Sequence, residues 1–352
     1  MVKVKGMKGG GYYNQFSGIQ SASVRKIWPW LRDAVTARSG DDIYEYLDLG
    51  SSNGHNTLLL ADEVVRTLHE QNPQRPIRLT LNDLPSNDWK AVALELYEGE
   101  GHSDIASHGV LANDIYTAFA AGSMFSRPVV PPETIDLAVT TIAIHWLSRH
   151  PDAPLGRYLV PNQAGVSPES HADWQTVSDQ DLRKFFGNRS MEIKTGGTLL
   201  ITWPAEGMWS IFVSPMQEAI ERAAARGMVP ATMVEGFSYP AYFHTLEEFQ
   251  QIYDEQPTRV SFDLERLETL EAPDPGQRLA AEGKFDQLAA LRVAEHRAVA
   301  EGLIDDYLSA VSVNDIEATR ENLFAALGSV WLERPKYRQI TSSIHAALLR
   351  RR

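Results

Sequence analysis

The sequence predicts an α/β fold in which a mostly parallel sheet carries helices on both faces and is followed by a largely helical cap. Three observations support this prediction. Short apolar runs typical of strands alternate with helical or loop segments from residue 43 to about residue 202. A glycine-rich turn follows the first run directly. Beyond about Pro204 the alternation fades, and helical patterns dominate the rest of the chain.

The first strand is expected at residues 43–49, and a turn and a helix come directly after it. The turn reads Asp48-Leu49-Gly50-Ser51-Ser52-Asn53-Gly54, and leucines and valines at helical spacing follow. An open α/β sheet presents nucleotide-like ligands at such a strand end. Gly50 and Gly54 would let the backbone approach a ligand. Neither the full G-x-G-x-x-G spacing nor the P-loop lysine pattern is present, which weakens a dinucleotide or triphosphate interpretation.

The second strand is expected at residues 77–81 and ends in Asn82-Asp83-Leu84-Pro85. An acidic residue at this place is suited to accept both ribose hydroxyls of a nucleoside. The glycine turn alone is equally consistent with an ordinary structural turn. Two successive acidic strand ends favour a nucleoside site.

Further strands are expected at residues 110–111, 135–144 and 198–202, with a helix over 173–193. Gly196-Gly197 is expected to turn the chain into the last of these strands. Residues 152–170 are expected to form a loop, either a lid over a site or a plain surface connection.

The cap is expected to contain helices at residues 214–227, 246–253, 276–303 and 314–327. We therefore divide the chain into an α/β core, residues 1–205, and a cap, residues 206–352, with a return of the chain to the core sheet left open. The basic end, Leu348-Leu349-Arg350-Arg351-Arg352, is expected to be a solvated helix terminus.

Composition excludes several classes of function. The 352 residues include 33 Lys and Arg against 46 Asp and Glu, and the formal charge of −13 disfavours nucleic acid as a partner. Because there is no cysteine, disulfides, thiolate nucleophiles and Cys-ligated metals are excluded. The amino terminus lacks the apolar core of a signal peptide, and no apolar stretch reaches the ~18 residues of a membrane span. We therefore expect a soluble, cytoplasmic protein without a membrane partner.

Short motifs along the first 250 residues carry a family resemblance. They are Met7-Lys8-Gly9-Gly10 with Tyr13, Ser17 and Gln20; Asp48-Leu49-Gly50-Ser51-Ser52 with Gly54 and Asn56; Asn82-Asp83-Leu84-Pro85 with Asn87-Asp88; Gly122-Ser123; His145-Trp146-Leu147-Ser148 with Pro151; Arg189 and Glu192 before Gly196-Gly197; and Phe237, Pro240, Tyr242 and Glu248. In this order they resemble the SABATH family of S-adenosylmethionine-dependent carboxyl methyltransferases, of the salicylate, benzoate, jasmonate and indole-acetate type. The chain looks like a divergent member.

The resemblance implies a class I methyltransferase, Rossmann-like sheet that binds S-adenosylmethionine and releases S-adenosylhomocysteine. The matching cofactor positions are Tyr13, Asp48, Gly50, Ser51, Asn56, Asp83, Leu84, Ser123 and Met124. Asp83 would bind the ribose, and Leu84 and Met124 would flank the adenine. The family usually has an aromatic residue where Met124 stands, but methionine is polarizable enough to cover an adenine face. Asp48 would either organise the glycine turn and attract the sulfonium or simply cap the turn backbone.

For the acceptor, the resemblance implies that Gln20 and Trp146 hold a carboxylate through an amide N–H and an indole N–H. Lys8, Ile142, His145 and Trp209 complete the implied substrate set. Ile142 stands where salicylate-type members often have tyrosine, so the pocket should differ from theirs. Aromatic and sulfur side chains at the start of the cap are candidates for the pocket wall: Trp203, Met208, Trp209, Phe212, Tyr239, Tyr242 and Phe243.

His145 is open to two interpretations, a hydrogen-bonded structural residue or an acid–base group. A carboxylate acceptor is ionised at neutral pH and requires no base, whereas an amine or phenol must lose a proton.

We expect methyl transfer to the carboxylate of a small, partly apolar acid. The alternatives are transfer to nitrogen or hydroxyl, and a cofactor-binding protein without catalysis. The resemblance also implies a homodimer, and in some relatives a magnesium ion, whose ligands the sequence does not place.

Overall fold

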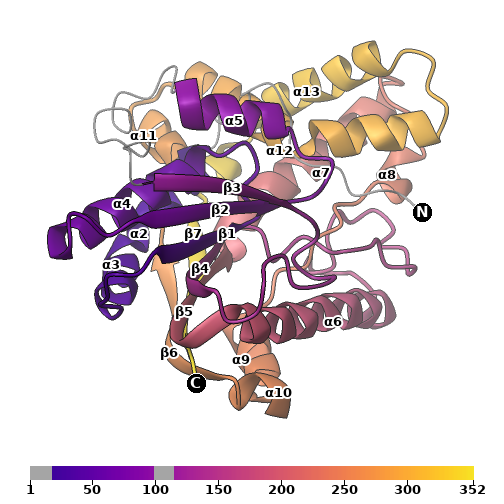
Figure 1. Cartoon of the computed structure of the whole chain (residues 1–352). Helices are drawn as coiled ribbons and strands as arrows, with labels where there is room; N and C mark the ends of the chain where they lie inside the picture. The colour runs from indigo at the N-terminus through magenta and orange to yellow at the C-terminus, as the bar shows by residue number, and fades with distance from the viewer. Residues whose placement is uncertain (1–17, 99–114) are drawn as a thin grey trace.

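The computed structural model describes residues 18–98 and 115–352. Within these residues, seven strands form one sheet in the order β3-β2-β1-β4-β5-β7-β6 (Figure 1). Strands β1 to β5 run parallel, and β7 lies antiparallel between β5 and β6. The predicted mostly parallel α/β sheet is confirmed. The strands are β1 (Tyr44–Leu49), β2 (Ile77–Asp83), β3 (Ile115–Ala121), β4 (Ile135–Thr141), β5 (Ile193–Pro204), β6 (Phe262–Glu271) and β7 (Ser343–Arg351).

Helices cover both faces of the sheet, because its central strands are apolar on both sides. In β5, Leu200 faces one core, and its neighbours Leu199 and Ile201 face the other. The first core takes apolar residues from α2, α3, α4, α7, α12 and α13, and the second takes them from α6 and α9. The helices are α2 (Gly18–Lys26), α3 (Trp28–Thr36), α4 (His55–Gln71), α5 (Trp89–Glu98), α6 (Pro168–Glu192), α7 (Glu206–Ala225), α8 (Met233–Gly236), α9 (Leu246–Asp254), α10 (Gln256–Arg259), α11 (Pro275–Ala281), α12 (Phe285–Ala310), α13 (Ile316–Glu333) and the 3₁₀ helix η1 (Pro335–Gln339).

Local sequence explains several helix boundaries. α6 begins at Pro168, because the Ser167 side chain accepts the N–H of Ser170 and proline suits the first helical position. α9 begins with a capping box between Thr245 and Glu248. The single helix predicted over residues 276–303 is two helices, α11 and α12, which separate at Gly283, a glycine with φ of +72°.

Two predicted strand features differ from the structure. Strand β3 at residues 115–121 was not predicted, and the weak strand expected at 110–111 lies outside the described residues. Gly196-Gly197 does not precede a strand but lies inside β5, where the pairing with β4 shifts register between Ile135 and Leu137. A φ of +77° at Gly196 gives the irregular backbone that such a bulge needs.

The prediction of a helix end at the basic carboxyl terminus is wrong, because these residues form the strand β7. Leu348 and Leu349 are almost completely buried between β5 and β6. Arg350 pairs with Glu265 at the sheet surface. Strands β6 and β7 belong to the part of the chain after residue 205, so this part supplies sheet as well as helices.

The strand order places a topological switch point beside β1. The chain proceeds from β1 to β2 and β3 on one side, and then to β4 and β5 on the other. Ligands of open α/β sheets bind at the carboxyl ends of the strands that flank such a point. Of the helices that the structure describes, none combines the length and the apolar character needed to cross a membrane.

Candidate active site

The glycine turn after β1 is built by close contacts to both neighbouring strands. The N–H groups of Gly50 and Ser51 donate to the carbonyl oxygen of Asn82 at 2.9 and 3.0 Å. Gly50 has φ of +84°, and a Cβ added to it would lie 2.6 Å from the Cβ of Ala143. Only glycine therefore fits between β1 and the segment after β4. The turn ends at Gly54, whose φ of +94° leads into α4.

Asp48 lies at the base of this turn and is buried. Its carboxyl group accepts the hydroxyl hydrogen of Thr57 on α4 and so ties β1 to the helix. Burial raises the pKa of Asp48 to about 7, and the nearby Asp83 contributes to the shift. A cation beside this carboxyl group would favour its ionised form.

Asp83 closes the second strand end, where its carboxylate is fixed by backbone groups. It accepts the N–H of Ser52 at 2.7 Å and that of Leu84 at 2.6 Å. Burial raises the pKa of Asp83. Asn87 also donates to the carbonyl of Ser52, at 2.7 Å, so the two strand ends form one bonded unit. The carboxylate oxygens retain lone pairs that can accept further hydroxyl groups.

The remaining predicted cofactor residues lie at the same edge of the sheet, with one exception. Ser123 and Met124 directly follow β3, and Met124 is 8% exposed. The side-chain hydroxyls of Ser51 and Ser52 are buried and make no hydrogen bond to the described residues. Tyr13, like the predicted acceptor residue Lys8, lies outside the described residues.

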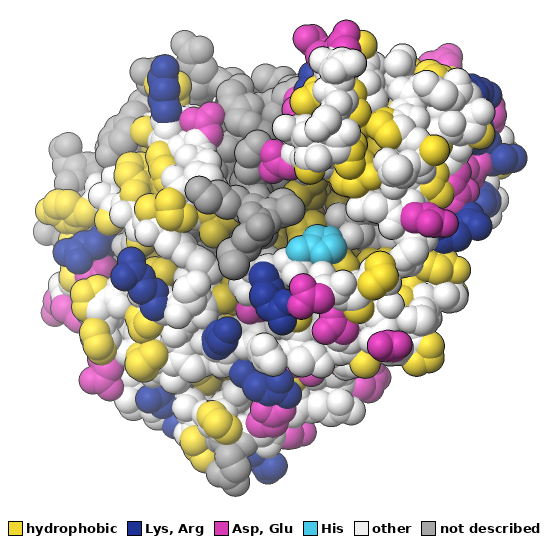
Figure 2. All heavy atoms as spheres, turned by 90° about the vertical axis from the view of Figure 1, so that its right-hand side faces the viewer, with side chains coloured by type: hydrophobic (Ala, Val, Ile, Leu, Met, Phe, Trp, Pro, Cys, Tyr) yellow, Lys and Arg dark blue, Asp and Glu magenta, His cyan; other side chains and the backbone are white. Residues whose placement is uncertain are grey.

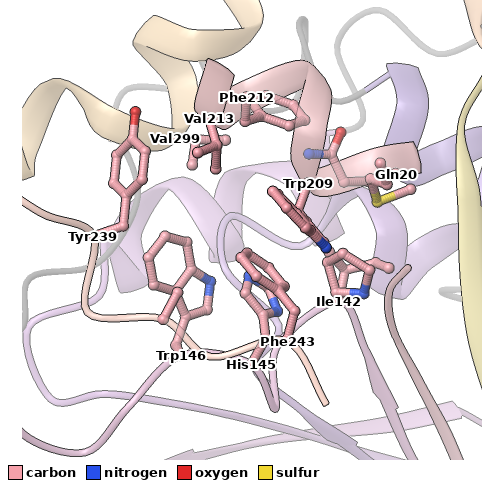
Figure 3. A pocket seen from close by; sticks show the side chains of 13 residues that line it. Gln20, Ile142, His145, Trp146, Trp209, Phe212, Val213, Tyr239, Phe243 and Val299 are labelled. Carbon is pink, nitrogen blue, oxygen red and sulfur yellow. The ribbon is translucent and has the colours of Figure 1, made fainter. Parts of the chain in front are cut away.

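A pocket beside this edge is lined almost entirely by apolar side chains. α2 contributes Gln20, the segment after β4 contributes Ile142, His145 and Trp146, and α7, the segment after α8, and α12 supply the other walls (Figure 3). On one face of the molecule, hydrophobic side chains gather in a hollow with charged side chains around it (Figure 2). The pocket is lined by Gln20, Ile142, His145, Trp146, Pro204, Met208, Trp209, Phe212, Val213, Tyr239, Ala241, Phe243 and Val299.

Three polar groups of this pocket have unused hydrogen-bonding capacity. They are Oε1 of Gln20, Nδ1 of His145 and Nε1 of Trp146, which are all buried and have no hydrogen-bond partner within residues 18–98 and 115–352. A buried polar atom without a partner is rare in folded proteins. Gln20 and Trp146 are therefore brought to one cavity with free polar groups, although 126 positions separate them in the sequence.

The position of Trp146 is set by the residues that precede α9. Trp146 forms an isolated antiparallel bridge with Ala241. On either side of it, Tyr242 N–H donates to the carbonyl of His145 at 2.9 Å, and Leu147 N–H donates to that of Pro240 at 2.8 Å. These backbone hydrogen bonds fix the position of Trp146, so the fold does not depend on a hydrogen bond from its indole N–H.

The position of Gln20 is set by the contact of α2 with α4. Ile19 is fully buried, and Ser21 Oγ donates to Oδ1 of Asn56 at 2.8 Å. Asn56, predicted to bind cofactor, therefore meets the helix that carries the predicted acceptor residue Gln20.

His145 belongs to a stack of three rings. Its imidazole lies 5.2 Å from the ring of Phe243 at an interplanar angle of 20°, and Phe243 stacks in turn on Trp209 at 5.6 Å and 13°. Burial lowers the pKa of His145 to about 3. The imidazole is therefore neutral at physiological pH.

Ile142 combines a pocket position with an unusual backbone. Its φ is +53°, a value that β-branched residues rarely adopt, and its N–H donates to the carbonyl of Thr202 at 2.9 Å. Backbone strain of this kind costs ~1–3 kcal/mol and is concentrated at functional sites.

Two of the aromatic residues proposed for the pocket wall belong to the core. Trp203 is 1% exposed, stacks on Phe249 at 4.5 Å and donates its indole N–H to the carbonyl of His244 at 2.8 Å. Tyr242 donates its hydroxyl to Glu248 at 2.7 Å. Both side chains already have partners, which explains why they do not face the cavity. The sequence prediction missed Pro204, Val213, Ala241 and Val299, which are ordinary apolar residues without a local signal.

The described residues do not assemble a metal site. Outside residues 1–17 and 99–114, no group of three or more acidic or histidine side chains gathers around a common point. A magnesium site is therefore not placed by these residues.

Comparisons with known proteins bear on the chemistry of this site. A family model described as "SAM dependent carboxyl methyltransferase" matches residues 1–351. The chain is 26% identical over 315 residues to indole-3-acetate O-methyltransferase 1 of Oryza sativa subsp. japonica, which covers 78% of this chain and 75% of that protein. It is 26% identical over 326 residues to probable jasmonic acid carboxyl methyltransferase 2 of Theobroma cacao, with 84% of each chain covered. The solved structure of loganic acid methyltransferase with SAH has the same fold, with a TM-score of 0.75 over 98% of both chains at 20% identity.

Proposed function

Because the chain belongs to the family of SAM-dependent carboxyl methyltransferases, we propose that it methylates a small monocarboxylic acid whose apolar body lies in the pocket between Gln20 and Trp146. The match over residues 1–351 confirms the family, the enzyme class and the S-adenosylmethionine requirement that the sequence motifs implied. The likeness to the loganic acid enzyme confirms the fold. The site residues and the acceptor are our proposal.

The residues at the sheet edge fit an adenosyl cofactor. Asp83 presents an ordered carboxylate for the ribose hydroxyls, and Leu84 and Met124 offer apolar faces for the adenine. In the turn that begins at Gly50, the hydroxyls of Ser51 and Ser52 have no other partner among the described residues. When bound here, S-adenosylmethionine supplies a methyl group activated by a sulfonium sulfur.

The acceptor proposal rests on the indole N–H of Trp146, which has no partner among the described residues and lies in an apolar cavity that Gln20 also lines. A neutral donor of this kind binds a carboxylate oxygen and fixes its direction without titrating. The described lining includes neither lysine nor arginine, so the groups that it offers to the acid are uncharged. These residues act by orientation and by excluding water, effects whose ceiling is on the order of 7–11 kcal/mol.

The neutral state of His145 favours a carboxylate over an amine or a phenol. A carboxylic acid, with a pKa near 4, has already lost its proton at neutral pH. A nitrogen or hydroxyl acceptor requires a base whose pKa lies near the working pH. The pKa of about 3 makes His145 too weak a base for that role. Its stacking on Phe243 and its tilted ring contact with Trp146 support a role in holding the pocket wall.

The acceptors named for the two relatives suggest the size of the acid. Indole-3-acetate and jasmonic acid each join one carboxylate to an apolar ring system. The stacked rings of Trp209 and Phe243 form a flat wall that suits such a body. Ile142, which follows β4, also lines the pocket, and we propose that it contributes to the choice among ring acids.

The test is transfer of a labelled methyl group from S-adenosylmethionine to a panel of ring-bearing and straight-chain monocarboxylic acids. Matched carboxamides, alcohols, amines and phenols serve as controls, because they keep the apolar body and lack the carboxylate. We expect label only in the esters of acids. Label in an amine or phenol, lost in His145→Gln, would establish the alternative acceptor. No label with any compound, together with intact binding of S-adenosylhomocysteine, would establish a binding protein without catalysis.

We also propose that the protein works as a homodimer in the cytoplasm. This extends the expectation from the family resemblance and from the composition. Light scattering during size-exclusion chromatography measures the first property, and a fluorescent fusion in cells measures the second. A monomer at micromolar concentration would contradict the dimer.

A further inference from the structure

The last two turns of α6 carry four residues on one face that the proposed function does not use. They are Phe185, Asn188, Arg189 and Glu192, whose spacing of three, four and seven positions puts them on one side of a helix. Arg189 and Glu192 are 0% exposed, and their side chains form an ion pair at 2.5 Å. Asn188 is 8% exposed. Two charges with no contact to water occupy the interior beside β4.

This face binds the backbone of the segment that follows β3. Asn188 Nδ2 donates to the carbonyls of Met124 and Phe125, both at 3.2 Å. Arg189 Nη1 donates to the carbonyl of Met124 at 3.3 Å. Glu192 Oε1 accepts the N–H of Val129 and, at 3.2 Å, that of Val130. We name the side chains of Asn188, Arg189 and Glu192 the α6 clamp. They bind the backbone of residues 124–130 at two separate places.

The other end of the same segment is attached to the proposed ribose site. Gly122 N–H donates to the carbonyl of Asp83 at 2.9 Å, and Asn82 Nδ2 donates to that of Gly122 at 2.9 Å. Ser123 and Met124 thus lie between two anchors, one on β2 and one on α6. The ring of Phe125 adds an apolar contact with Phe185 at 6.3 Å between centroids.

Stability alone does not explain the Arg189–Glu192 ion pair. Removing two charges from water costs about as much as their attraction returns, so a buried pair is weak evidence for a stabilising role. Here Glu192 Oε1 and Arg189 Nη1 bind backbone groups of one loop, whereas Nη2 of Arg189 is buried without a partner among the described residues.

We infer that the α6 clamp positions Met124 against the adenine, so that Asn188, Arg189 and Glu192 are positioning residues for cofactor affinity although they lie behind the site. This inference rests on the proposed cofactor site at Asp83 and Met124. It accounts for Arg189 and Glu192, two motif residues to which the sequence assigned no role.

The chain contains a matched control. Arg292 and Glu295 on α12 form a second buried pair at three-residue spacing, 2.7 Å apart, with exposed fractions of 3% and 1%. Each arginine also lies over an aromatic ring, Arg189 at 5.1 Å from Phe185 and Arg292 at 5.3 Å from Trp331. The further partner of Arg292 is Asp274, which lies before α11, far along the chain from the loop after β3.

The experiment compares Asn188→Ala, Arg189→Met and Arg292→Met in the full-length protein. Calorimetry gives the Kd for S-adenosylhomocysteine, methyl-transfer assays give kcat and both KM values, and thermal melting reports stability. For Asn188→Ala and Arg189→Met we expect the Kd and the KM for S-adenosylmethionine to rise at least fivefold, with kcat and the acceptor KM within twofold of wild type. Arg292→Met should lower the Tm and leave the cofactor Kd within twofold.

The outcomes separate the inference from the proposal beneath it. If the wild type binds S-adenosylhomocysteine and both clamp variants match Arg292→Met in Kd, the positioning role is refuted. If the wild type does not bind S-adenosylhomocysteine, the proposed cofactor site itself is wrong. Asn188→Ala leaves no buried charge without a partner, so it decides the question even where Arg189→Met fails to fold.

Discussion

Trp146→Phe tests the acceptor site most directly, because it removes one N–H and keeps an aromatic ring. The indole nitrogen is buried without a partner among the described residues and faces a pocket lined by apolar side chains. A hydrogen bond to a charged group contributes about 1.5–3 kcal/mol. If the indole N–H binds the carboxylate in the transition state, kcat/KM for the acid should fall about 10- to 150-fold.

The same substitution should have little effect on the fold. The donor has no partner in the described structure, so its removal breaks no hydrogen bond there. We expect the free energy of unfolding to remain within about 1 kcal/mol of wild type. The Kd for S-adenosylhomocysteine should also be unchanged, because Trp146 follows β4 and does not belong to the bonded unit around Asp83.

Trp203→Phe is the matched control. Its indole N–H donates to the carbonyl of His244 at 2.8 Å inside the core, so its removal leaves a buried carbonyl without its donor. We expect Trp203→Phe to lower the free energy of unfolding by about 1–3 kcal/mol in urea titrations and to spare acceptor kcat/KM. Unchanged acceptor kinetics in Trp146→Phe, or an equal loss of cofactor affinity, would refute the assignment.

Three further variants test the cofactor site and His145. Asp83→Ala removes the acceptor of the Ser52 and Leu84 N–H groups. Calorimetry should show the Kd for S-adenosylhomocysteine rising at least about tenfold. An unchanged Kd would exclude the ribose role. His145→Gln should lower acceptor kcat/KM less than about tenfold, since one hydrogen bond or ring contact is lost. It should leave kcat flat between pH 6 and 8 at saturating cofactor, because the imidazole does not titrate in that range. A wild-type rate that follows a pKa near neutrality, together with a variant rate that does not, would contradict this. Asp48 has a pKa of about 7 and ionises between pH 6 and 8. Because S-adenosylmethionine carries a sulfonium charge and S-adenosylhomocysteine does not, this ionisation should tighten binding of the former about tenfold relative to the latter. Asp48→Asn should abolish this pH trend in calorimetry. Because this folded pKa lies above the unfolded value near 4, the contribution of Asp48 to stability is greatest below pH 4 and is lost as the pH rises through 7.

Elements with local signals were readable from the amino-acid sequence. An apolar run, an acidic strand end and a glycine turn identified the first strand and helix, and Asp83 identified the second strand end. These features are readable because strand periodicity and glycine φ values are properties of a few adjacent residues. The spacing of short motifs along the chain likewise implied the family and its cofactor.

Tertiary structure decided what depends on distant partners. Leu348 and Leu349 form an interior strand only because β5 and β6, which come earlier in the chain, pair with β7 on either side. Val299 lines the pocket only because α12 packs across α7, and no neighbour in sequence marks it. Trp203 and Trp146 look alike as aromatic residues beside strand ends, yet the indole N–H of Trp203 meets a carbonyl and that of Trp146 has no partner among the described residues. Burial and hydrogen-bond partners are set by contacts between distant segments, and local sequence does not contain them.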